Sequence, residues 1–549
     1  MAKLSYDPVQ TFDIYVQMRG SIRATSRETG MSRGAVKYRL EKASRDHGLE
    51  YGKPISGGKV HAFKTVKAAL PKKGEIKRYV LTSAQNNTDA HVPFFENLVA
   101  YAEHVDAQLM VSQFTYNKNA YGQMSVKPGT APTADDTRTL WYDPIFEPYV
   151  ANNRIELAPM LTFCGEINVL PTAARPLSGF ETYTARSSGI FPHAKMAMES
   201  IAGTVDDGAK FNYTTGTATL LNYMQKKAGL QAEFHHTFGA VIAEVNHEGM
   251  WWVRQLNADN DGSFYDIPNG SGATFVQGGE VSTNIDVEAV NWGDLHPEVI
   301  DSECKALAFN EGGILDTLRP RHQFAHDVLD FRARNHHEIK NPHAMFKRFN
   351  EGTADVREEV QRVRNLLHEI KRDFCMTVVV DSNHDNALER WLREADYRYD
   401  PANAIFFLEC QLDKYSAIQR EDTQHHVVRE ALRREGVDKS IIFLGPDDSF
   451  VLCDDDKGGI ECGMHGHLGP NGSRGSARGL SRMGRKANTG HTHSAQILDG
   501  MYVAGTFTRL RLDYTKGPSS WSHSFIVTYP NGKRAIVTIY NGKWRATPN

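Results

Sequence analysis

The stretch Gly293-Asp294-Leu295-His296 directly follows the apolar run Val287-Glu288-Ala289-Val290 and points to the fold of the C-terminal half. An apolar run of this length is typical of a buried strand. A carboxylate and an imidazole two residues apart, just past the end of a strand, can both turn toward one metal ion. Alone, Asp-x-His is a weak signal, because it occurs by chance in many proteins. It gains weight from similar clusters farther along the chain.

Four more clusters of metal-competent side chains lie downstream, each near the end of an expected strand. Ligands distant in sequence converge in this way at the carboxyl ends of strands in open α/β sheets. Asp, Asn and His without Cys suit Mn²⁺, Fe²⁺ or Zn²⁺ better than Ca²⁺. So many ligands exceed what one ion needs, whereas a pair of ions bridged by one carboxylate would use them all. The clusters are His326-Asp327-Val328-Leu329-Asp330, Ser382-Asn383-His384-Asp385, His465-Gly466-His467 and Gly490-His491-Thr492-His493.

The order of these clusters over residues 286–505 resembles the five-motif signature of calcineurin-like metallophosphoesterases. The resemblance implies a β-sandwich flanked by helices and two divalent metal ions, for which we expect Mn²⁺. It also implies a catalytic imidazole that holds no metal, His384, with Asp385 as the carboxylate that orients it. By position, the implied ligands are Asp294, His296, Asp327 and His493 for the first metal, and Asp327 as the bridge, Asn383, His491 and His465 or His467 for the second.

Two details qualify this resemblance. We favour His465 over His467, because His465 lies nearer the expected strand at residues 459–462. The chain departs from the family pattern at His326 and Ser382, where the family has glycine, and a long charged helix lies between Asp327 and Asn383. The substitutions at His326 and Ser382 do not remove a ligand. We interpret Asp330 as a support for the ligands rather than as a ligand.

The N-terminal 75 residues are basic, with 15 Lys and Arg against 7 Asp and Glu. Residues 21–40 predict a short helix, a glycine turn at Gly30, a Ser32 N-cap and a second helix. This pattern resembles helix-turn-helix DNA binders, and the alternative is a small basic helical unit that serves assembly. On the polar side of the second helix we expect DNA contacts from Arg33, Lys37 and Arg39.

The middle segment, residues 76–285, predicts a separate α/β domain whose role the sequence does not indicate. Tyr79–Thr82 and Leu109–Val111 read as strands on either side of a helix over Phe94–Val105, and a Gly/Pro/Thr-rich loop follows at Lys127–Thr137. Asp89-Ala90-His91 repeats the Asp-x-His pattern but lacks matched partners downstream. We therefore expect it to be a loop or a helix cap.

The remaining segment, residues 286–549, is expected to form the catalytic domain. Strands are predicted near 287–291, 376–381, 404–408, 440–444 and 500–506. Helices are predicted over Thr353–Arg372 and Asn386–Ala395. Two Asn-Gly pairs, at 531–532 and 541–542, predict antiparallel hairpins in the tail. The chain is thus expected to be an α/β protein divided at 1–75, 76–285 and 286–549.

Composition excludes several classes of protein. The six cysteines include no Cys-x-x-Cys pair, which favours reduced thiols over a disulfide framework or a zinc ribbon. We find no apolar run long enough to span a membrane and no signal-peptide pattern, so neither a membrane span nor secretion is expected. The net charge of −3 is close to neutral, and the basic N-terminal end favours a polyanionic partner.

The expected substrate is DNA. The basic N-terminal unit supports it, as does the loop Asn471–Arg478, in which Arg474 and Arg478 lie between two ligand clusters. We therefore expect a metal-dependent deoxyribonuclease that hydrolyses phosphodiesters by a two-metal mechanism. Two alternatives stay open: a phosphomonoesterase such as a protein phosphatase, and a non-catalytic DNA-binding scaffold. The loop itself has the alternative of being a flexible surface loop.

Over its whole length, from Met1-Ala2-Lys3-Leu4-Ser5 to Gly542-Lys543-Trp544-Arg545, the chain also resembles the pre-early DNA-transfer proteins of T-five-like coliphages. The resemblance implies a phage protein that is made early in infection, acts in the host cell cytoplasm and takes part in destroying host DNA. Expected partners are DNA, further copies of the chain in a homo-oligomer, and another phage early protein.

Overall fold

The computed structural model describes residues 6–18, 22–49, 65–116, 141–454, 458–512 and 515–548. The chain divides into two compact units, residues 1–65 and 66–549. The boundary expected near residue 285 does not separate compact units, because strands from both sides of it belong to one sheet. The loop predicted at Lys127–Thr137 lies outside the described residues.

The first unit consists of three helices, α1 (Pro8–Gln17), α2 (Ile22–Thr29) and α3 (Arg33–His47). The expected signals act as predicted: Gly30 has a φ of 67°, and the Ser32 hydroxyl accepts from the backbone N–H of Ala35 at 3.2 Å. Tyr15, Val36 and Leu40 form its small core. The helix, turn and second helix predicted for residues 21–40 are therefore present.

The C-terminal half of the second unit contains a six-stranded sheet. Its four parallel strands are joined by helices, and two antiparallel strands complete one edge. The strand order is β17 (Ile442–Phe443), β16 (Met376–Val379), β15 (His322–Ala325), β14 (Ala289–Asn291), β23 (Ser524–Thr528) and β24 (Arg534–Thr538). The connecting helices are α6 (Ser302–Phe309), α7 (Ile314–Leu318), η2 (Arg332–Arg334), α8 (Pro342–Asn350), α9 (Val356–Ile370), α10 (Asn386–Glu394), η3 (Tyr397–Tyr399), α11 (Ala404–Gln419) and α12 (Val427–Arg434).

One predicted strand is wrong. Residues 404–408 begin helix α11, in which Phe406, Phe407 and Cys410 are buried at helical spacing. A short apolar run is compatible both with a buried strand and with one buried face of a helix, and here it belongs to a helix. The predicted helices over 353–372 and 386–395 are confirmed as α9 and α10. The Asn531-Gly532 turn joins β23 to β24 as expected, whereas the turn at 541–542 closes only one isolated bridge, between Tyr540 and Lys543.

A second sheet of eleven strands runs through both sequence halves of this unit. Its order is β1 (Val66–Lys67), β4 (Arg154–Ala158), β5 (Leu161–Cys164), β6 (Ser188–Phe191), β8 (Lys210–Thr214), β7 (Met198–Ile201), β21 (Gln496–Leu498), β22 (Met501–Val503), β20 (Lys486–Thr489), β19 (Ile460–Glu461) and β18 (Val451–Leu452). Short helices lie in its connections: η1 (Pro144–Tyr149), η4 (Pro470–Gly472), α13 (Ala477–Leu480) and η5 (Ser481–Met483).

The N-terminal half adds a four-stranded sheet with the order β10 (Trp251–Asn257), β9 (Gly239–Asn246), β2 (Ile76–Gln85) and β3 (Ala107–Phe114). The helix α4 (Val92–His104) connects β2 to the parallel strand β3, as the sequence predicts. His91 caps this helix, since its Nδ1 accepts from the backbone N–H of Phe94 at 3.1 Å. The half is completed by α5 (Lys227–Phe234) and a small sheet of β11 (Phe264–Asp266), β12 (Ala273–Gln277) and β13 (Glu280–Ile285).

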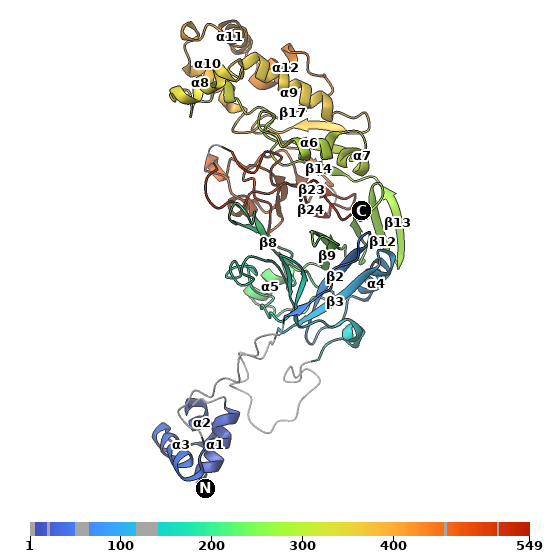
Figure 1. Ribbon diagram of the computed structural model, residues 1–549, viewed down its shortest axis with the longest axis vertical. Helices are drawn as coiled ribbons and strands as arrows, with labels where there is room; N and C mark the ends of the chain where they lie inside the picture. The colour runs from blue at the N-terminus through green and yellow to red at the C-terminus, as the bar shows by residue number, and fades with distance from the viewer. Residues whose placement is uncertain are drawn as a thin grey trace. The chain divides into compact units, whose positions relative to one another are not determined.

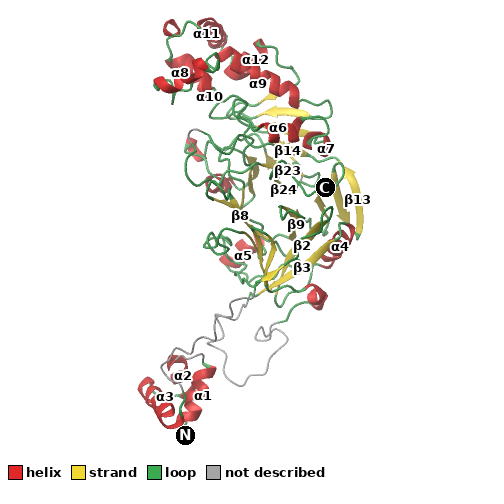
Figure 2. Cartoon of the chain, in the orientation of Figure 1, coloured by secondary structure: helices red, strands yellow, loops and turns green. Residues whose placement is uncertain are grey.

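The smaller sheets pack face to face on the eleven-stranded sheet. In the C-terminal half, Ala289, Phe324 and Val378 meet Leu452 and Ile460 between the sheets. The next residues along the same strands face the opposite way and are covered by helices α6 to α12 (Figure 1). This alternation follows from the two-residue period of strands. The second unit is thus a mixed α/β structure, with sheets packed in pairs and helices outside, and most of its helix lies in the C-terminal half (Figure 2).

The two halves of the second unit share one topology. Strands β3-β2-β9-β10 match β15-β14-β23-β24, and strands β4-β5-β6-β8-β7 match β18-β19-β20-β22-β21, in both order and direction. The halves meet where β7 pairs antiparallel with β21, at Met198 opposite Ile497. A short sequence repeat supports the match: residues 213–219 and 502–508 both read Tyr-x-x-Gly-Thr-x-Thr.

Two expectations from composition concern reduced cysteines and the lack of a membrane span. All six cysteines are free, as predicted, and five of them are buried. Within the described ranges, no helix is both long enough and apolar enough to cross a membrane.

Candidate metal centre

The predicted ligands occupy loops that follow strands β14, β15, β16, β19 and β20. Four of them have backbones in the left-handed region that non-glycine residues rarely adopt: φ is 41° at His296, 49° at Asp327, 75° at His491 and 57° at His493. Such conformations cost about 1–3 kcal/mol each and gather at functional sites. The four residues in this unusual backbone conformation are all predicted metal ligands.

The first predicted ligand set converges in the structure. One ligand atom each from Asp294, His296, Asp327 and His493 lies within 4.8 Å of the others, and all four residues are buried. The Nε2 atom of His493 is 2.9 Å from Oδ2 of Asp294, and the Nε2 atom of His296 is 3.2 Å from Oδ2 of Asp327. These residues can therefore hold one metal ion between them.

Two of the residues predicted for a second metal, His465 and His491, lie next to the first set. His465 places Nε2 3.3 Å from Oδ2 of Asp327 and is almost fully buried. The ring of His491 lies 5.2 Å from that of His465, and its backbone N–H donates to Oδ1 of Asp294 at 3.0 Å. His467 is one step further out, with its ring 5.5 Å from that of His465. The geometry thus favours His465 as the closer donor.

The donor atoms of this cluster are poorly satisfied by the protein itself. Buried polar atoms are nearly always hydrogen-bonded, so a group of exceptions requires an explanation. Within the described ranges, the atoms at this site that lack a hydrogen-bond partner include Oδ1 of Asp327, Oδ1 of Asn383, both ring nitrogens of His326 and the Nδ1 atoms of His465, His467 and His493. Oxygen and imidazole donors left open around two central carboxylates fit a divalent metal centre.

His384 lies beside this cluster. Its Nδ1 is 3.0 Å from Oδ1 of Asp330, and its ring centroid is 4.7 Å from that of His296. Burial lowers the pKa of His384, but the carboxylates of Asp327 and Asp330 outweigh burial and hold that pKa above its ordinary value. Asp330 also lies 3.3 Å from Nδ1 of His296. It therefore supports one predicted ligand and the predicted catalytic imidazole, as expected.

Asp385 differs from its expected role. Its Oδ1 accepts from the backbone N–H of Leu329 at 3.3 Å, which anchors the loop between Asp327 and Asp330. Burial and the neighbouring Asp381 raise the pKa of Asp385 to about 7. The carboxylate that orients His384 is therefore Asp330. Position in sequence favoured Asp385, because only the fold brings residue 330 next to residue 384.

The predicted DNA-contacting side chains are placed as follows. Arg33 and Lys37 are exposed on α3, whereas Arg39 is half-buried and its guanidinium contacts the sulfur of Met31. Arg474 is exposed on the loop between the two histidine clusters, and Arg478 is exposed on the short helix α13 that follows. A cavity of about 470 Å³ runs from His465 and His467 to residues 469–472 of that loop, so the loop borders the metal centre.

Three features of the site were not predicted from the sequence, although His326 stood out there as a departure from the family pattern. Trp521 packs its ring against His493, with centroids 4.1 Å apart. His326 is fully buried next to His465, where the family pattern has glycine. Arg332 reaches toward Asp330 at 3.8 Å. Only the Tyr-x-x-Gly-Thr-x-Thr repeat was visible in the sequence as a signal that the site belongs to one of two similar halves.

Comparison with known proteins gives one clear relative. No family model matches the chain, and no solved structure matches it. The chain is 41% identical to Protein A1 of Escherichia phage T5 over 481 residues, which is 86% of this chain and 83% of the relative. Identity at this level over most of both chains shows common descent. The chain therefore belongs to the family of Protein A1 of Escherichia phage T5.

Proposed function

We propose that the C-terminal half is a calcineurin-like metallophosphoesterase that hydrolyses DNA phosphodiesters. The observation that carries the proposal is the buried convergence of Asp294, His296, Asp327 and His493 from three separate loops. A structural ion-pair network would satisfy its own donors and acceptors, whereas this cluster leaves many of them open. Such a set of open donors is characteristic of a site built for ions.

The chain's residues divide between holding metal and moving a proton. Asp294, His296, Asp327 and His493 would hold one ion, and Asn383, His465 and His491 would complete a second around Asp327. When bound, two divalent ions, for which we propose Mn²⁺, would activate a water molecule and neutralise charge on the phosphate oxygens. His296, Asp327, His491 and His493 adopt unusual backbone conformations without a bound ion, so their side chains would be oriented before metal binding.

The role proposed for His384 is to protonate the leaving oxygen. With Nδ1 held by Asp330, the imidazole keeps Nε2 as its second donor position. The carboxylates of Asp327 and Asp330 raise the pKa of His384 against the effect of burial, so the protonated form persists at higher pH. A positioned acid of this kind contributes about 10²–10⁴-fold to a rate. Replacing His384 should therefore affect the rate more than the metal content.

DNA is the substrate that the chain's basic surfaces favour. Arg33 and Lys37 on α3 and Arg474 and Arg478 beside the metal centre are exposed. Guanidinium and ammonium groups bind backbone phosphates regardless of sequence, as a nuclease with many target sites requires. The kinship with a phage protein is in keeping with degradation of host DNA in the host cytoplasm, with other copies of the chain and another phage early protein as proposed partners.

The test is to incubate the purified full-length protein with linear and circular duplex DNA in Mn²⁺ or in EDTA. We expect cleavage of both DNA forms in Mn²⁺ and none in EDTA. His384→Ala should abolish cleavage and keep the metal content of the wild type. Hydrolysis of an aryl phosphomonoester without DNA cleavage would instead identify a phosphomonoesterase, and DNA binding without hydrolysis of either substrate would identify a scaffold.

A further inference from the structure

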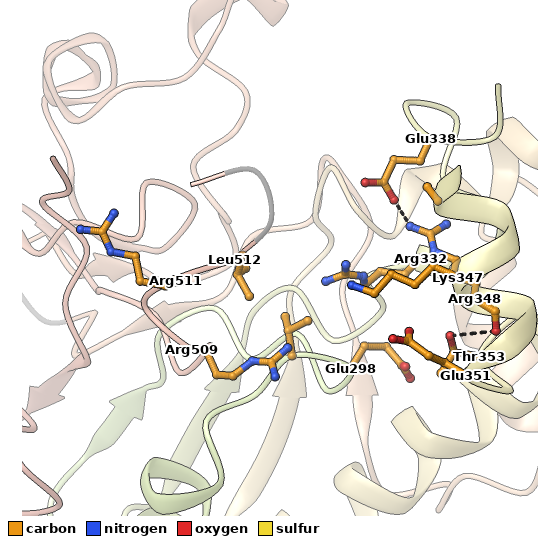
Figure 3. A pocket seen from close by; sticks show the side chains of 12 residues that line it. Glu298, Arg332, Glu338, Lys347, Arg348, Glu351, Thr353, Arg509, Arg511 and Leu512 are labelled. Carbon is orange, nitrogen blue, oxygen red and sulfur yellow. Dashed lines mark hydrogen bonds and ion pairs between the residues drawn. The ribbon is translucent and has the colours of Figure 1, made fainter. Parts of the chain in front are cut away.

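A pocket of about 490 Å³ lies beside the metal centre (Figure 3). Two of its walls come from segments that carry metal-competent side chains. Glu298 follows His296 by two residues, and Arg332 follows Asp330 by two and lies 3.8 Å from it. The backbone N–H of Arg509 donates to the carbonyl oxygen of Val299 at 3.0 Å, which ties the third wall to the same loop.

The pocket has a surplus of positive charge. Two of its acidic side chains are already engaged, Glu338 with Arg348 and Glu298 with Arg362. In Figure 3, Arg332 and Arg509 extend from opposite walls toward the middle of the pocket. The charged lining residues are Arg332, Lys347, Arg348, Arg509 and Arg511, with Glu298, Glu338 and Glu351.

Arg348 shows that the pocket is built for an anion. This side chain lies on α8 with only 6% of its surface exposed, and its Nη1 has no hydrogen-bond partner although the guanidinium pairs with Glu338. A buried charged donor without an acceptor is costly, so an acceptor from outside the chain is expected to complete it. Arg509 is exposed on the facing wall, and no side-chain partner for it is found among the described residues.

We propose that this pocket binds a backbone phosphate of the nucleic-acid strand, next to the phosphate that is hydrolysed at the metal centre. The proposal rests on the proposed function and narrows its substrate to a polymer. Guanidinium forks match the geometry of phosphate oxygens, which suits Arg348 and Arg509 to this task. A phosphomonoester has no second phosphate to place here, so the pocket would distinguish a nucleic-acid strand from a small ester.

The experiment compares Arg509→Ala and Arg348→Gln with Arg398→Ala, which removes an exposed arginine outside the pocket. Binding of a fluorescent DNA duplex is measured by anisotropy in EDTA, where no hydrolysis occurs, at several salt concentrations. Each pocket variant should weaken binding and lower the slope of log K against log salt by about one. The control should leave both quantities unchanged. All variants should hydrolyse bis(4-nitrophenyl) phosphate in Mn²⁺ as the wild type does.

The outcomes separate this proposal from the proposed function. Wild-type affinity and salt slope in a soluble Arg509→Ala protein would overturn the pocket, whatever becomes of Arg348→Gln, which changes a buried group. Failure of the wild type to hydrolyse either DNA or the small diester would overturn the proposed function alone. Competition by inorganic phosphate that disappears in Arg509→Ala would support the pocket as a phosphate site.

A second inference comes from the repeated topology, and it does not depend on the pocket. The carbonyl oxygen of Ser83 accepts from the N–H of Ala218 and the hydroxyl of Thr217, at 2.9 and 2.8 Å. The carbonyl oxygen of Asp294 accepts from Phe507 and Thr506 in the same way, at 2.8 and 3.0 Å. Ser83 therefore stands where the C-terminal half has Asp294.

The strand registers extend this match to the other ligands. Gln85 corresponds to His296, two residues further on, and Ser112 opposite Ser83 corresponds to Asp327. Ile190 and Asn488 each pair with the first residue of the Tyr-x-x-Gly-Thr-x-Thr repeat, so five residues later Lys195 corresponds to His493. Asp89-Ala90-His91, which imitates the Asp-x-His pattern in sequence, lies past these positions.

The replacing side chains close the site with their own hydrogen bonds. Ser83 donates to the carbonyl oxygen of Gly216 at 2.6 Å, and Ser112 donates to that of Gly165 at 2.8 Å. Gln85 donates to Thr88 and to the carbonyl oxygen of Asn222, both at 3.1 Å. The open donors that mark the metal centre are thus absent at these four described positions, because Lys195 is also paired, with Asp499.

We infer that residues 66–285 are a second, metal-free copy of the sandwich that positions the metal loop of the first. Ser200 donates to the carbonyl oxygen of Ala495 at 2.7 Å, two residues after His493. Gly203 and Ser519 exchange backbone hydrogen bonds at 3.0 Å, close to Trp521, whose ring packs on His493. The N-terminal copy therefore holds both segments that flank this ligand.

Two variants at the matched positions test this inference in the full chain. Lys195→Met breaks the ion pair with Asp499, which joins the two copies, and should lower the melting temperature in EDTA without changing the Mn²⁺ content. His493→Gln should lower the Mn²⁺ content and leave the melting temperature in EDTA nearly unchanged. Twice the expected two ions per wild-type chain would show that the N-terminal copy holds metal, and an unchanged melting temperature in Lys195→Met would show that the junction does not hold the two copies together. Either result would overturn the inference.

Discussion

At the scale of single residues, the site is defined by which carboxylate contacts which imidazole. Asp294 and Asp327 lie at its centre, and Asp330 joins His296 to His384. Asp385, one residue after His384 in sequence, turns instead toward the backbone of Leu329. His384 therefore contacts a carboxylate that is distant in sequence, Asp330, and not the adjacent Asp385. Matched substitutions of Asp330 and Asp385 can distinguish their roles.

Asp330→Asn should lower the rate of DNA cleavage about 10²-fold, because it removes the charge that holds His384 protonated and oriented. Asp385→Asn should keep most of the activity, since burial raises the pKa of Asp385 to about 7 and the amide oxygen can still accept from Leu329. Single-turnover cleavage rates at saturating Mn²⁺ make the comparison. Equal losses in the two variants would contradict the assignment of Asp330.

At the scale of elements, buried charge fixes how strands and helices meet. Arg254 on β10 is buried between Glu244 on β9 and Asp266 on β11, with contacts of 2.8 to 2.9 Å. Removing Arg254 would leave Asp266 buried without a charged partner, whereas Glu244 would keep Arg78, whose Nε lies 3.0 Å from its Oε1. On the other side of the unit, Glu359 on α9 accepts from the backbone N–H groups of Arg332 and Ala333, at 2.7 and 2.9 Å.

Arg254→Leu should destabilise the second unit by about 3–5 kcal/mol, because two carboxylates lose their shared partner in the core. Chemical denaturation followed by tryptophan fluorescence measures the effect. Arg398→Ala, which removes an exposed arginine whose ion pair among the described residues is with Asp396, is the control and should leave stability nearly unchanged. A small effect for both variants would show that the buried network does not hold these strands together.

The raised pKa of Glu359 predicts that the stability of the second unit depends on pH. Burial raises its folded-state pKa from 4.5 to about 7, although its two backbone hydrogen bonds oppose the shift. The folded protein therefore binds a proton more tightly than the unfolded chain, and this contribution to stability is lost as the pH rises from 4.5 to 7. In EDTA, Glu359→Gln should flatten the fall of the melting temperature over this range. A fall as steep as that of the wild type would contradict the shift.

At the scale of the whole molecule, the sequence predicted the Asp/His cluster better than the architecture. The motifs placed Asp294, His296, Asp327 and His493 together correctly. The first three follow neighbouring parallel strands of one sheet, whose ends meet at one edge, whereas His493 follows β20 of the eleven-stranded sheet packed against it. The sequence did not reveal that residues 76–285 share a sheet with residues 286–549, because long-range strand pairing leaves no local pattern. Residues 404–408 were mistaken for a strand, because a run of apolar residues this short fits a buried strand as well as a helix.

Metal binding should stabilise the second unit and leave the first unit untouched, since all the metal-competent groups found in the described chain lie between residues 294 and 493. Mn²⁺ at about 100 times its dissociation constant should add about 2.7 kcal/mol to the stability of the folded state for each independent site. Differential scanning calorimetry in Mn²⁺ and in EDTA measures the shift. A transition that does not respond to Mn²⁺ would contradict a metal site in the core of this unit.

One metal centre, built only from the C-terminal half, is proposed to serve the whole chain. Anomalous scattering from a crystal of the Mn²⁺-loaded protein tests this proposal most directly. We expect two peaks that share Asp327, one next to Asp294, His296 and His493 and the other next to Asn383, His465 and His491. A map without peaks at these residues, or with peaks at Ser83, Ser112 and Lys195, would contradict it.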